Sequence, residues 1–144
     1  MKPVLNQLNL VVRDMHAMVG FYERLGLDIG ASMGEWAPHH RKAADPGGLD
    51  VDFDSTAFAS VWNGGWPAGQ TGIVLGFTIE SRAGVDALFE ELVGAGYAAQ
   101  QEPYDAFWGA RFAVVVDPDG NSVGLMSDVD PSYKSAPPQL PDPS

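Results

Sequence analysis

Polar and apolar positions repeat the same pattern twice along this chain. Each copy reads as an apolar-rich strand, a short polar stop, an amphipathic helix and a glycine. Val74 lies 67 residues after Gln7, and Ser81 lies 67 residues after Asp14. The two copies span residues 7–26 and 74–96. Internal repetition at a fixed offset predicts two copies of one structural module, related by a pseudo-two-fold axis.

The helical part of each copy has a start signal and a single apolar stripe. Asp14 and Ser81 are good N-caps, because their side-chain oxygens accept hydrogen bonds from the free N–H groups of a first helical turn. We therefore expect helices near residues 14–25 and 81–95. Their buried stripes are predicted at Met15, Met18, Val19, Tyr22 and Leu25, and at Val85, Leu88, Phe89 and Leu92.

Further strands complete a strand–helix–strand–strand–strand unit, or βαβββ module, in each copy. Residues 34–48 lack periodicity and contain proline and paired glycines, so we expect a loop there. The DPDGN turn at 117–121 predicts a hairpin between the last two strands. Strands are predicted at 27–33, 49–53, 57–62, 97–102, 111–116 and 122–126. The predicted fold class is α+β, with two βαβββ modules related by a pseudo-two-fold axis.

Changes in composition divide the chain into four parts. Glycine gathers between the two modules, and proline and serine gather at the end of the chain. We expect this last part to be an extended or disordered arm. The predicted boundaries are 1–62 for the first module, 63–72 for the linker, 73–127 for the second module and 128–144 for the arm.

Alternation along the first strand of each module predicts two different sheet faces. Leu8, Leu10 and Val12 are expected to pack against the helix, which leaves Gln7 and Asn9 on the opposite face. The same opposite face is predicted to carry Val74, Gly76 and Thr78, then Phe58, Ser60 and Trp62, and finally Ser122, Gly124 and Met126. This face is smaller, more polar and partly aromatic, which is typical of a surface that lines a cavity.

Charge and composition exclude several classes of protein. The chain has 144 residues and a formal net charge of −11. Its basic residues are scattered, so we predict no nucleic-acid partner, because such binding needs a basic patch. Without a membrane-spanning apolar run, a signal peptide or cysteine, we predict a cytoplasmic protein with no membrane partner and no disulfides. The acidity either keeps the protein soluble or attracts a cationic small molecule.

Two segments carry a resemblance to a known superfamily. They are LNLVVRDMHAMVGFYERLGL at residues 8–27 and DPDGNSVGLMS at residues 117–127. Together, in this order, they resemble the vicinal oxygen chelate superfamily, which includes glyoxalase, bleomycin-resistance and dioxygenase proteins. The resemblance covers roughly residues 4–127. It implies paired βαβββ modules, each an incomplete barrel, that enclose a cleft, usually in a homodimer.

The resemblance also implies where relatives that use a metal hold it. They place His or Gln on the first strand of each module and Glu on the last strand of each module. In this chain these positions fall on Gln7, Ser60, Val74 and Gly124. A divalent metal needs several lone pairs from carboxylates or imidazoles, and here only Gln7 offers a suitable atom. We therefore predict no metal and no cofactor.

The histidines and tryptophans each have a structural and a functional interpretation. His16 is expected on the helix surface, and the adjacent His39 and His40 point apart in a loop, where a lid role is the alternative to a structural one. Trp62, with Trp66 or Trp108, either stacks on a flat ligand or fills the core. The spacing of possible nucleophiles and bases identifies no catalytic residue.

Two main classes of function remain. The favoured one is a non-enzymatic binding protein that sequesters an aromatic or cationic compound without metal. The alternative is a lyase, isomerase or dioxygenase-like enzyme with a non-standard or absent metal site, and a third class is a scaffold or regulatory subunit. We expect a homodimer, with the arm and Tyr133 reaching the partner. The predicted ligand contacts are Gln7, Asn9, Ser60, Trp62, Val74, Trp108, Ser122 and Gly124.

Overall fold

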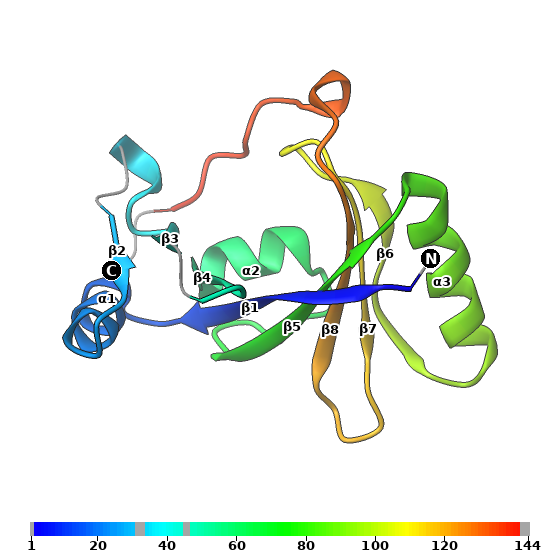
Figure 1. Ribbon diagram of the computed structural model, residues 1–144, viewed down its shortest axis with the longest axis horizontal. Helices are drawn as coiled ribbons and strands as arrows, with labels where there is room; N and C mark the ends of the chain where they lie inside the picture. Colours follow the sequence, from blue (N-terminus) through cyan, green and yellow to red (C-terminus); the bar gives the residue numbers. More distant parts are fainter. Residues whose placement is uncertain (1, 31–33, 45–46, 142–144) are drawn as a thin grey trace.

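The chain folds around one curled eight-stranded sheet (Figure 1). The structure is a computed structural model that describes residues 2–30, 34–44 and 47–141. The strand order is β2-β3-β4-β1-β5-β8-β7-β6. The strands are β1 (Val4–Val12), β2 (Asp28–Ile29), β3 (His40–Ala44), β4 (Asp50–Ser55), β5 (Gly72–Ile79), β6 (Ala98–Asp105), β7 (Arg111–Val116) and β8 (Ser122–Ser127).

The strand order is symmetric about its centre, as the repeat predicts. β1 and β5 pair antiparallel in the middle, with Leu8 opposite Leu75. Each of them pairs in parallel with the last strand of its own module, β4 in the first module and β8 in the second. The two βαβββ modules and their pseudo-two-fold relation are therefore confirmed.

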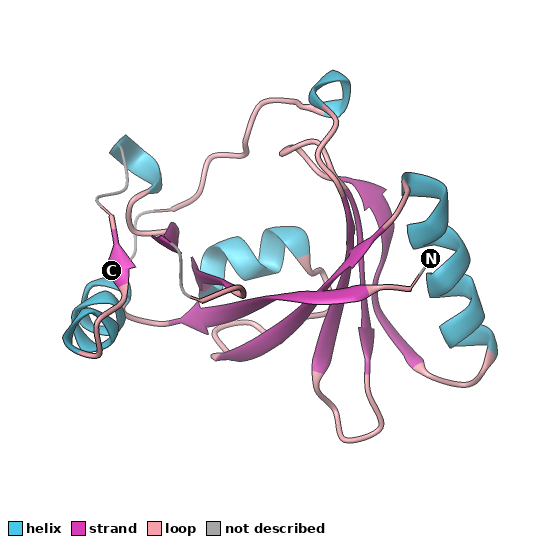
Figure 2. Ribbon diagram, viewed as in Figure 1, coloured by secondary structure: helices cyan, strands magenta, loops and turns pink. Residues whose placement is uncertain are grey.

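Two long helices cover the outer face of the sheet, one in each module (Figure 2). α1 (Met15–Arg24) begins where the Asp14 carboxylate accepts a hydrogen bond from Ala17 N. α3 (Arg82–Gly94) begins where the Ser81 hydroxyl accepts one from Gly84 N. Both predicted helices are confirmed at the predicted caps. No helix in the described ranges is both long and apolar enough to cross a membrane.

The core has three parts that follow the two sheet faces. One cluster packs under α1 and a second under α3, with Val12 and Phe53 in the first and Ile79 and Val85 in the second. A third, more aromatic cluster lies on the opposite face, where its strand residues are Val11, Val74, Phe112 and Val114. The division between a helix-packed face and an aromatic face therefore agrees with the alternation in the sequence.

Two predictions for the first module are wrong. Residues 57–62 form a helix, α2 (Thr56–Trp62), which begins where the Ser55 hydroxyl accepts from Phe58 N. The predicted loop at 34–48 contains β3, which adds to β4 with His40 opposite Asp54. It also contains a short 3-10 helix, η1 (Gly34–Trp36). The strand predicted at 27–33 is β2 alone, since residues 31–33 lie outside the described residues.

The C-terminal arm folds back over its own chain as far as residue 141 (Figure 1). After the short 3-10 helix η2 (Pro131–Tyr133), Ser135 N donates a 3.0 Å hydrogen bond to Phe107 O. The Arg82 guanidinium carbon lies 3.6 Å from the centroid of the Tyr133 ring. These contacts hold Tyr133 and the start of the arm against the same chain, and contact of the arm with a partner subunit stays a prediction.

Gly65 is expected to tolerate no side chain. An added Cβ would overlap the backbone oxygen of Gln100 on β6 and lie 2.7 Å from the Cγ atom of Gln100. We expect Gly65→Ala to lower the free energy of unfolding by about 1–3 kcal/mol, because the backbone cannot move aside cheaply. Gly64→Ala is the matched control, since its Cβ would meet only the tip of the Gln101 side chain, at 3.2 Å. Urea unfolding that gives equal losses for both variants would contradict this account.

Candidate functional site

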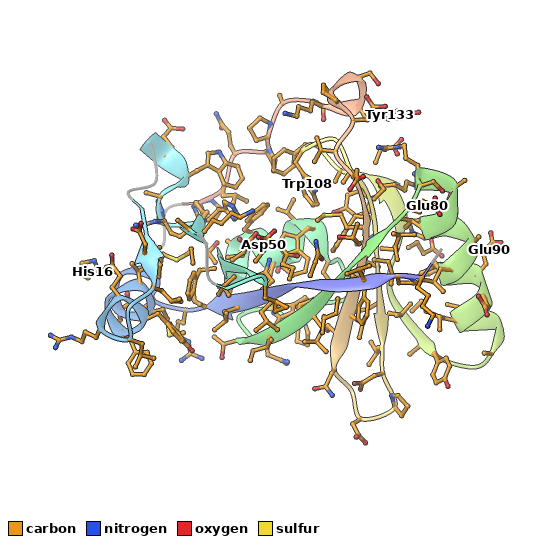
Figure 3. All side chains as sticks on the ribbon, in the orientation of Figure 1. His16, Asp50, Glu80, Glu90, Trp108 and Tyr133 are labelled. Carbon is orange, nitrogen blue, oxygen red and sulfur yellow. The ribbon has the colours of Figure 1, made fainter. Side chains whose placement is uncertain are left out.

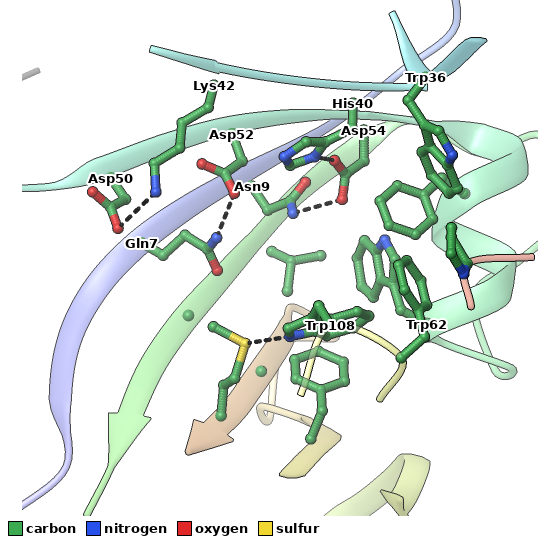
Figure 4. A pocket seen from close by; sticks show the side chains of 18 residues that line it. Gln7, Asn9, Trp36, His40, Lys42, Asp50, Asp52, Asp54, Trp62 and Trp108 are labelled. Carbon is green, nitrogen blue, oxygen red and sulfur yellow. Dashed lines mark hydrogen bonds and ion pairs between the residues drawn. The ribbon is translucent and has the colours of Figure 1, made fainter. Parts of the chain in front are cut away.

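A cavity of about 510 Å³ lies on the sheet face opposite α1 and α3. Its polar lining consists of Gln7, Asn9, His40, Lys42, Asp50, Asp52 and Asp54. Its aromatic lining consists of Trp36, Phe58, Trp62, Phe107, Trp108 and Phe112. Val74, Gly76, Gly124, Met126 and Pro137 complete it. Figure 4 shows the polar groups gathered on one side and the rings on the other, and Figure 3 places Asp50 and Trp108 within the whole chain.

Most of the predicted ligand contacts line this one cavity. They come from both modules: β1 and β5 supply strand residues, α2 supplies a tryptophan, and the segment before β7 supplies another. The predicted residues that the structure brings together are Gln7, Asn9, Trp62, Val74, Trp108 and Gly124.

Two predicted contacts, Ser60 and Ser122, do not line the cavity. Ser60 lies on the exposed side of α2, where its hydroxyl donates to Thr56 O. Its assignment to the cavity assumed a strand, and a helix turns the side chain away. Ser122 is buried near the start of β8, and its hydroxyl donates to the side-chain oxygen of Gln100 at 2.6 Å.

The structure adds three carboxylates that the sequence analysis did not assign to the site. Asp50, Asp52 and Asp54 alternate with apolar residues along β4, so all three side chains point to the same face. Parallel pairing sets Asn9 opposite Asp52. The alternating sequence DVDFDS was itself the signal, because it has the period of a strand with one acidic face.

Two of these carboxylates have a basic side chain beside them. His40 Nδ1 lies 2.6 Å from Asp54 Oδ1, and Lys42 Nζ lies 3.4 Å from Asp50 Oδ2. Burial lowers the pKa of His40. The hydrogen bond to Asp54 and the negative charges of Asp54 and Asp52 outweigh burial and raise this pKa above its usual value. The predicted loop histidine is therefore a cavity residue held by a carboxylate, whereas His39 is buried against the Ser55 hydroxyl.

Asp52 is the carboxylate whose charge is not offset by direct contact. Among the described residues its only hydrogen bond comes from Gln7 Nε2, at 2.8 Å, and no cation lies within salt-bridge distance. Burial raises the pKa of Asp52 from 3.8 to about 6, and the charge of Asp54 adds to this, against the opposing effects of His40, Lys42 and Gln7. The side chain therefore titrates close to neutral pH inside the cavity.

Three buried polar atoms of the cavity lining have no hydrogen-bond partner among the described residues. They are Asn9 Oδ1, Asp52 Oδ1 and Trp62 Nε1. The three residues are 9%, 7% and 3% exposed. A buried polar atom without a partner costs roughly 1–3 kcal/mol, so three around one cavity indicate that a ligand or water completes them.

The aromatic side of the cavity is a connected set of edge-to-face contacts. Phe112 is central, with the rings of Trp62 and Trp108 at centroid distances of 5.9 and 5.7 Å. Trp108 Nε1 donates to Met126 Sδ at 3.4 Å. Trp66 belongs to the same aromatic cluster but does not line the cavity, and its Nε1 donates to Gln70 O. Of the candidates for stacking, Trp62 and Trp108 are therefore the ones in place.

A family model matches nearly the whole length of the two βαβββ modules. The model of the Glyoxalase/Bleomycin resistance protein/Dioxygenase superfamily matches residues 4–125. The chain belongs to this superfamily. No curated protein matches this superfamily member in sequence.

Solved structures with the same fold include several described as enzymes. An NAD-dependent benzaldehyde dehydrogenase from Legionella pneumophila has a TM-score of 0.64 and 19% identity, covering 85% of this chain and 97% of that one. Methylmalonyl-CoA epimerase from Mycobacterium tuberculosis has a TM-score of 0.55 and 17% identity, covering 90% of this chain and 89% of that one. The Mn(II)-bound glyoxalase from Novosphingobium aromaticivorans has a TM-score of 0.58 and 21% identity, covering 96% of this chain and 44% of that one. At these identities the likeness concerns the fold.

The residues at the four metal positions of the superfamily do not fit a metal. Asn9 and Gly76 are equivalent positions of the two modules, and they pair with Asp52 and Gly124 on the last strand of each module. Asp52 is therefore the equivalent of Gly124, and the acidic position of the first module falls on Asp52 and not on Ser60. The four positions are therefore Gln7, Asp52, Val74 and Gly124. At these four positions only Gln7 and Asp52, both in the first module, have side-chain oxygen atoms. Gln7 Nε2 donates a hydrogen bond to one carboxylate oxygen of Asp52. Among the described residues no group of three or more His, Cys, Asp or Glu could hold a metal ion.

We expect nickel, zinc or iron(II) to bind far below one equivalent. A stable site needs about four protein ligands, and two of the four positions have none. The measurement is metal analysis after incubation and desalting of protein purified without chelators. One equivalent of metal that Asp52→Asn removes would contradict this expectation. Gly124→Glu does not restore the site simply, because a Cβ at residue 124 already lies 3.1 Å from the Phe112 ring.

Proposed function

We propose that this superfamily member is a cytoplasmic small-molecule-binding protein that sequesters a cationic aromatic compound without metal. The observation that carries the proposal is the pairing, in one cavity, of a wall of aromatic rings with the buried carboxylate of Asp52. A flat, positively charged molecule meets both features at once. The lining residues come from both modules, so the ligand would lie between them.

The aromatic wall supports binding of a flat ring system. Offset or edge-to-face contacts with Trp62 and Trp108 contribute roughly 0.5–1.5 kcal/mol each beyond the apolar area that is buried. The volume of about 510 Å³ lies in the range of small-molecule sites.

The polar wall supports a positive charge on the ligand. Asp54 and Asp50 have His40 and Lys42 beside them, whereas Asp52 has only an amide. A cationic group next to Asp52 would replace the water that burial removes, and would lower the pKa of Asp52 again. Ligand binding should therefore release a proton from Asp52 when it occurs near pH 6.

The test is a tryptophan-fluorescence titration with one-, two- and three-ring aromatic amines and their neutral alcohol counterparts. We expect the amines to quench fluorescence and to bind at least tenfold more tightly than the alcohols, about 1.4 kcal/mol. Equal affinity for amines and alcohols would refute the cationic preference. Conversion of a bound compound to product, followed by mass spectrometry, would refute sequestration.

A second candidate function is an isomerase or lyase that uses Asp52 as a general base. The observation that favours it is a carboxylate of the cavity lining with a pKa of about 6 and one buried oxygen that has no hydrogen-bond partner among the described residues. Such a group can take a proton from a carbon next to a carbonyl and return it, since its pKa is close to the operating pH. Exchange of a substrate C–H hydrogen with D2O, lost in Asp52→Asn, would establish this alternative.

We also propose that the protein is a homodimer. Phe21 and Leu25, four residues apart on α1 and its C-cap, are both large and apolar, with exposed fractions of 57% and 69%. Apolar groups of this kind on a small protein support an interaction surface. Light scattering at micromolar concentration should give twice the 15.4 kDa chain mass. A monomer mass would refute the proposal.

A further inference from the structure

The hydrogen bonds on the polar wall fix the orientation of two amide side chains. Gln7 Nε2 donates to Asp52 Oδ2 at 2.8 Å, and Asn9 Nδ2 donates to Asp54 Oδ2 at 2.9 Å (Figure 4). An ionised carboxylate only accepts hydrogen bonds, so in each amide the nitrogen must face the carboxylate. The amide oxygens of Gln7 and Asn9 then do not take part in these two hydrogen bonds.

As a result, the buried atoms of the polar wall that have no partner among the described residues are acceptors. Asn9 Oδ1 and Asp52 Oδ1 are buried and have no partner among the described residues. These two residues are direct neighbours across the pairing of β1 with β4. Gln7 Oε1 adds a third acceptor beside them, over Gly76, where a Cβ would lie only 2.7 Å from it. One N–H group of Gln7 and one of Asn9 are already engaged by carboxylates.

We propose that the ligand carries a protonated amine or amidine with at least two N–H groups, which it donates to Asn9 Oδ1 and Asp52 Oδ1. This inference rests on the proposed binding of a cationic aromatic compound and specifies its charged group. A quaternary ammonium ion would balance the charge of Asp52 but would leave both acceptors buried and unpaired. An ammonium or amidinium group satisfies the charge and both acceptors together, because it has donors and no acceptor.

The experiment is a methylation series on one ring system. Calorimetric titration compares 2-naphthylmethylammonium with its N,N-dimethyl and N,N,N-trimethyl counterparts, all cationic at pH 7.5. The neutral 2-naphthylmethanol serves as the uncharged member. We expect the primary ammonium to bind at least tenfold more tightly than the trimethyl ion, about 1.4 kcal/mol. The dimethyl compound, which has one N–H and nearly the bulk of the trimethyl ion, should lie between them.

Asn9→Val separates hydrogen bonding from steric bulk. It removes one acceptor, together with the hydrogen bond to Asp54, without changing the formal charge of the cavity, in a β-strand that favours valine. We expect the primary ammonium to lose affinity severalfold and the trimethyl ion to keep its affinity, so that their ratio falls. An unchanged ratio would mean that bulk alone causes the difference, and would overturn the inference. If this variant does not fold, the comparison of the dimethyl and trimethyl ions decides, because they differ by one N–H at nearly equal bulk, and equal affinities for these two ions overturn the inference.

The outcomes distinguish this inference from the proposed function. A trimethyl ion that binds as tightly as the primary ammonium overturns the requirement for N–H donors, while the binding of cationic aromatics stands. If none of the three cations binds and larger aromatic amines also fail, the proposed function itself is overturned. A primary ammonium that binds best, with the ratio reduced in Asn9→Val, supports both.

Discussion

Asp52→Asn is expected to make the protein more stable at alkaline pH and a poorer binder of cations. The folded pKa of Asp52 is raised to about 6, whereas the unfolded value is 3.8. Because the folded state holds its proton more tightly, the favourable contribution of Asp52 is fully present below about pH 4. It is lost as the pH rises through about 6. The shift corresponds to as much as about 3 kcal/mol at pH 8, since one pKa unit is about 1.4 kcal/mol.

The asparagine variant avoids this loss, because its side chain stays neutral and can still accept from Gln7. Urea unfolding should show the stability difference between variant and wild type growing by as much as about 3 kcal/mol from about pH 4 to about pH 8. Asp119→Asn is the matched control, since Asp119 is exposed in the hairpin turn and lies outside the cavity lining. It should change stability by less than about 0.5 kcal/mol at either pH.

The same substitution should weaken binding of 2-naphthylmethylammonium by more than tenfold. The introduced amide would use its oxygen to accept from Gln7 and would turn an N–H donor toward the ligand, in place of a charged acceptor. A substitution that raises stability and weakens binding indicates that the original residue serves function at a cost in stability. Unchanged binding, or a stability difference independent of pH, would contradict the role given to Asp52.

Trp62 is expected to matter for both stability and binding. Trp62→Ala should lower the free energy of unfolding by about 3–5 kcal/mol, because the ring is 3% exposed and packs edge-to-face on Phe112. Trp62→Phe keeps an aromatic ring and removes the unpartnered Nε1. This milder variant should remain folded and should bind aromatic amines several-fold more weakly. Urea unfolding and calorimetric titration measure the two effects.

Trp66→Phe is the matched control for the tryptophan prediction. Trp66 is also buried, at 7% exposure, and belongs to the same hydrophobic cluster, but it lies outside the cavity lining. Its substitution removes the hydrogen bond to Gln70 O and should reduce stability without changing affinity. Equal losses of affinity in Trp62→Phe and Trp66→Phe would mean that the effect passes through the core rather than through contact with the ligand.

The sequence alone determined the modules and the central part of the site. The repeat offset, the caps Asp14 and Ser81, and the alternation along β1 and β5 are local signals, and each was found where the pattern predicted it. The side chains of Gln7 and Asn9 face the cavity because period-two alternation already fixes the face of a strand.

Only the tertiary structure decided the chemistry beside them. Residues 57–62 are a short apolar run that suits a strand or a helix, and the cap at Ser55 and packing on the sheet select the helix. The carboxylates of β4 join Gln7 and Asn9 in the polar wall of the cavity only because that strand pairs in parallel with β1, more than forty residues away in sequence. Burial, the hydrogen-bond direction of the amides and the pKa of Asp52 all depend on this non-local pairing, which no pattern within one segment encodes.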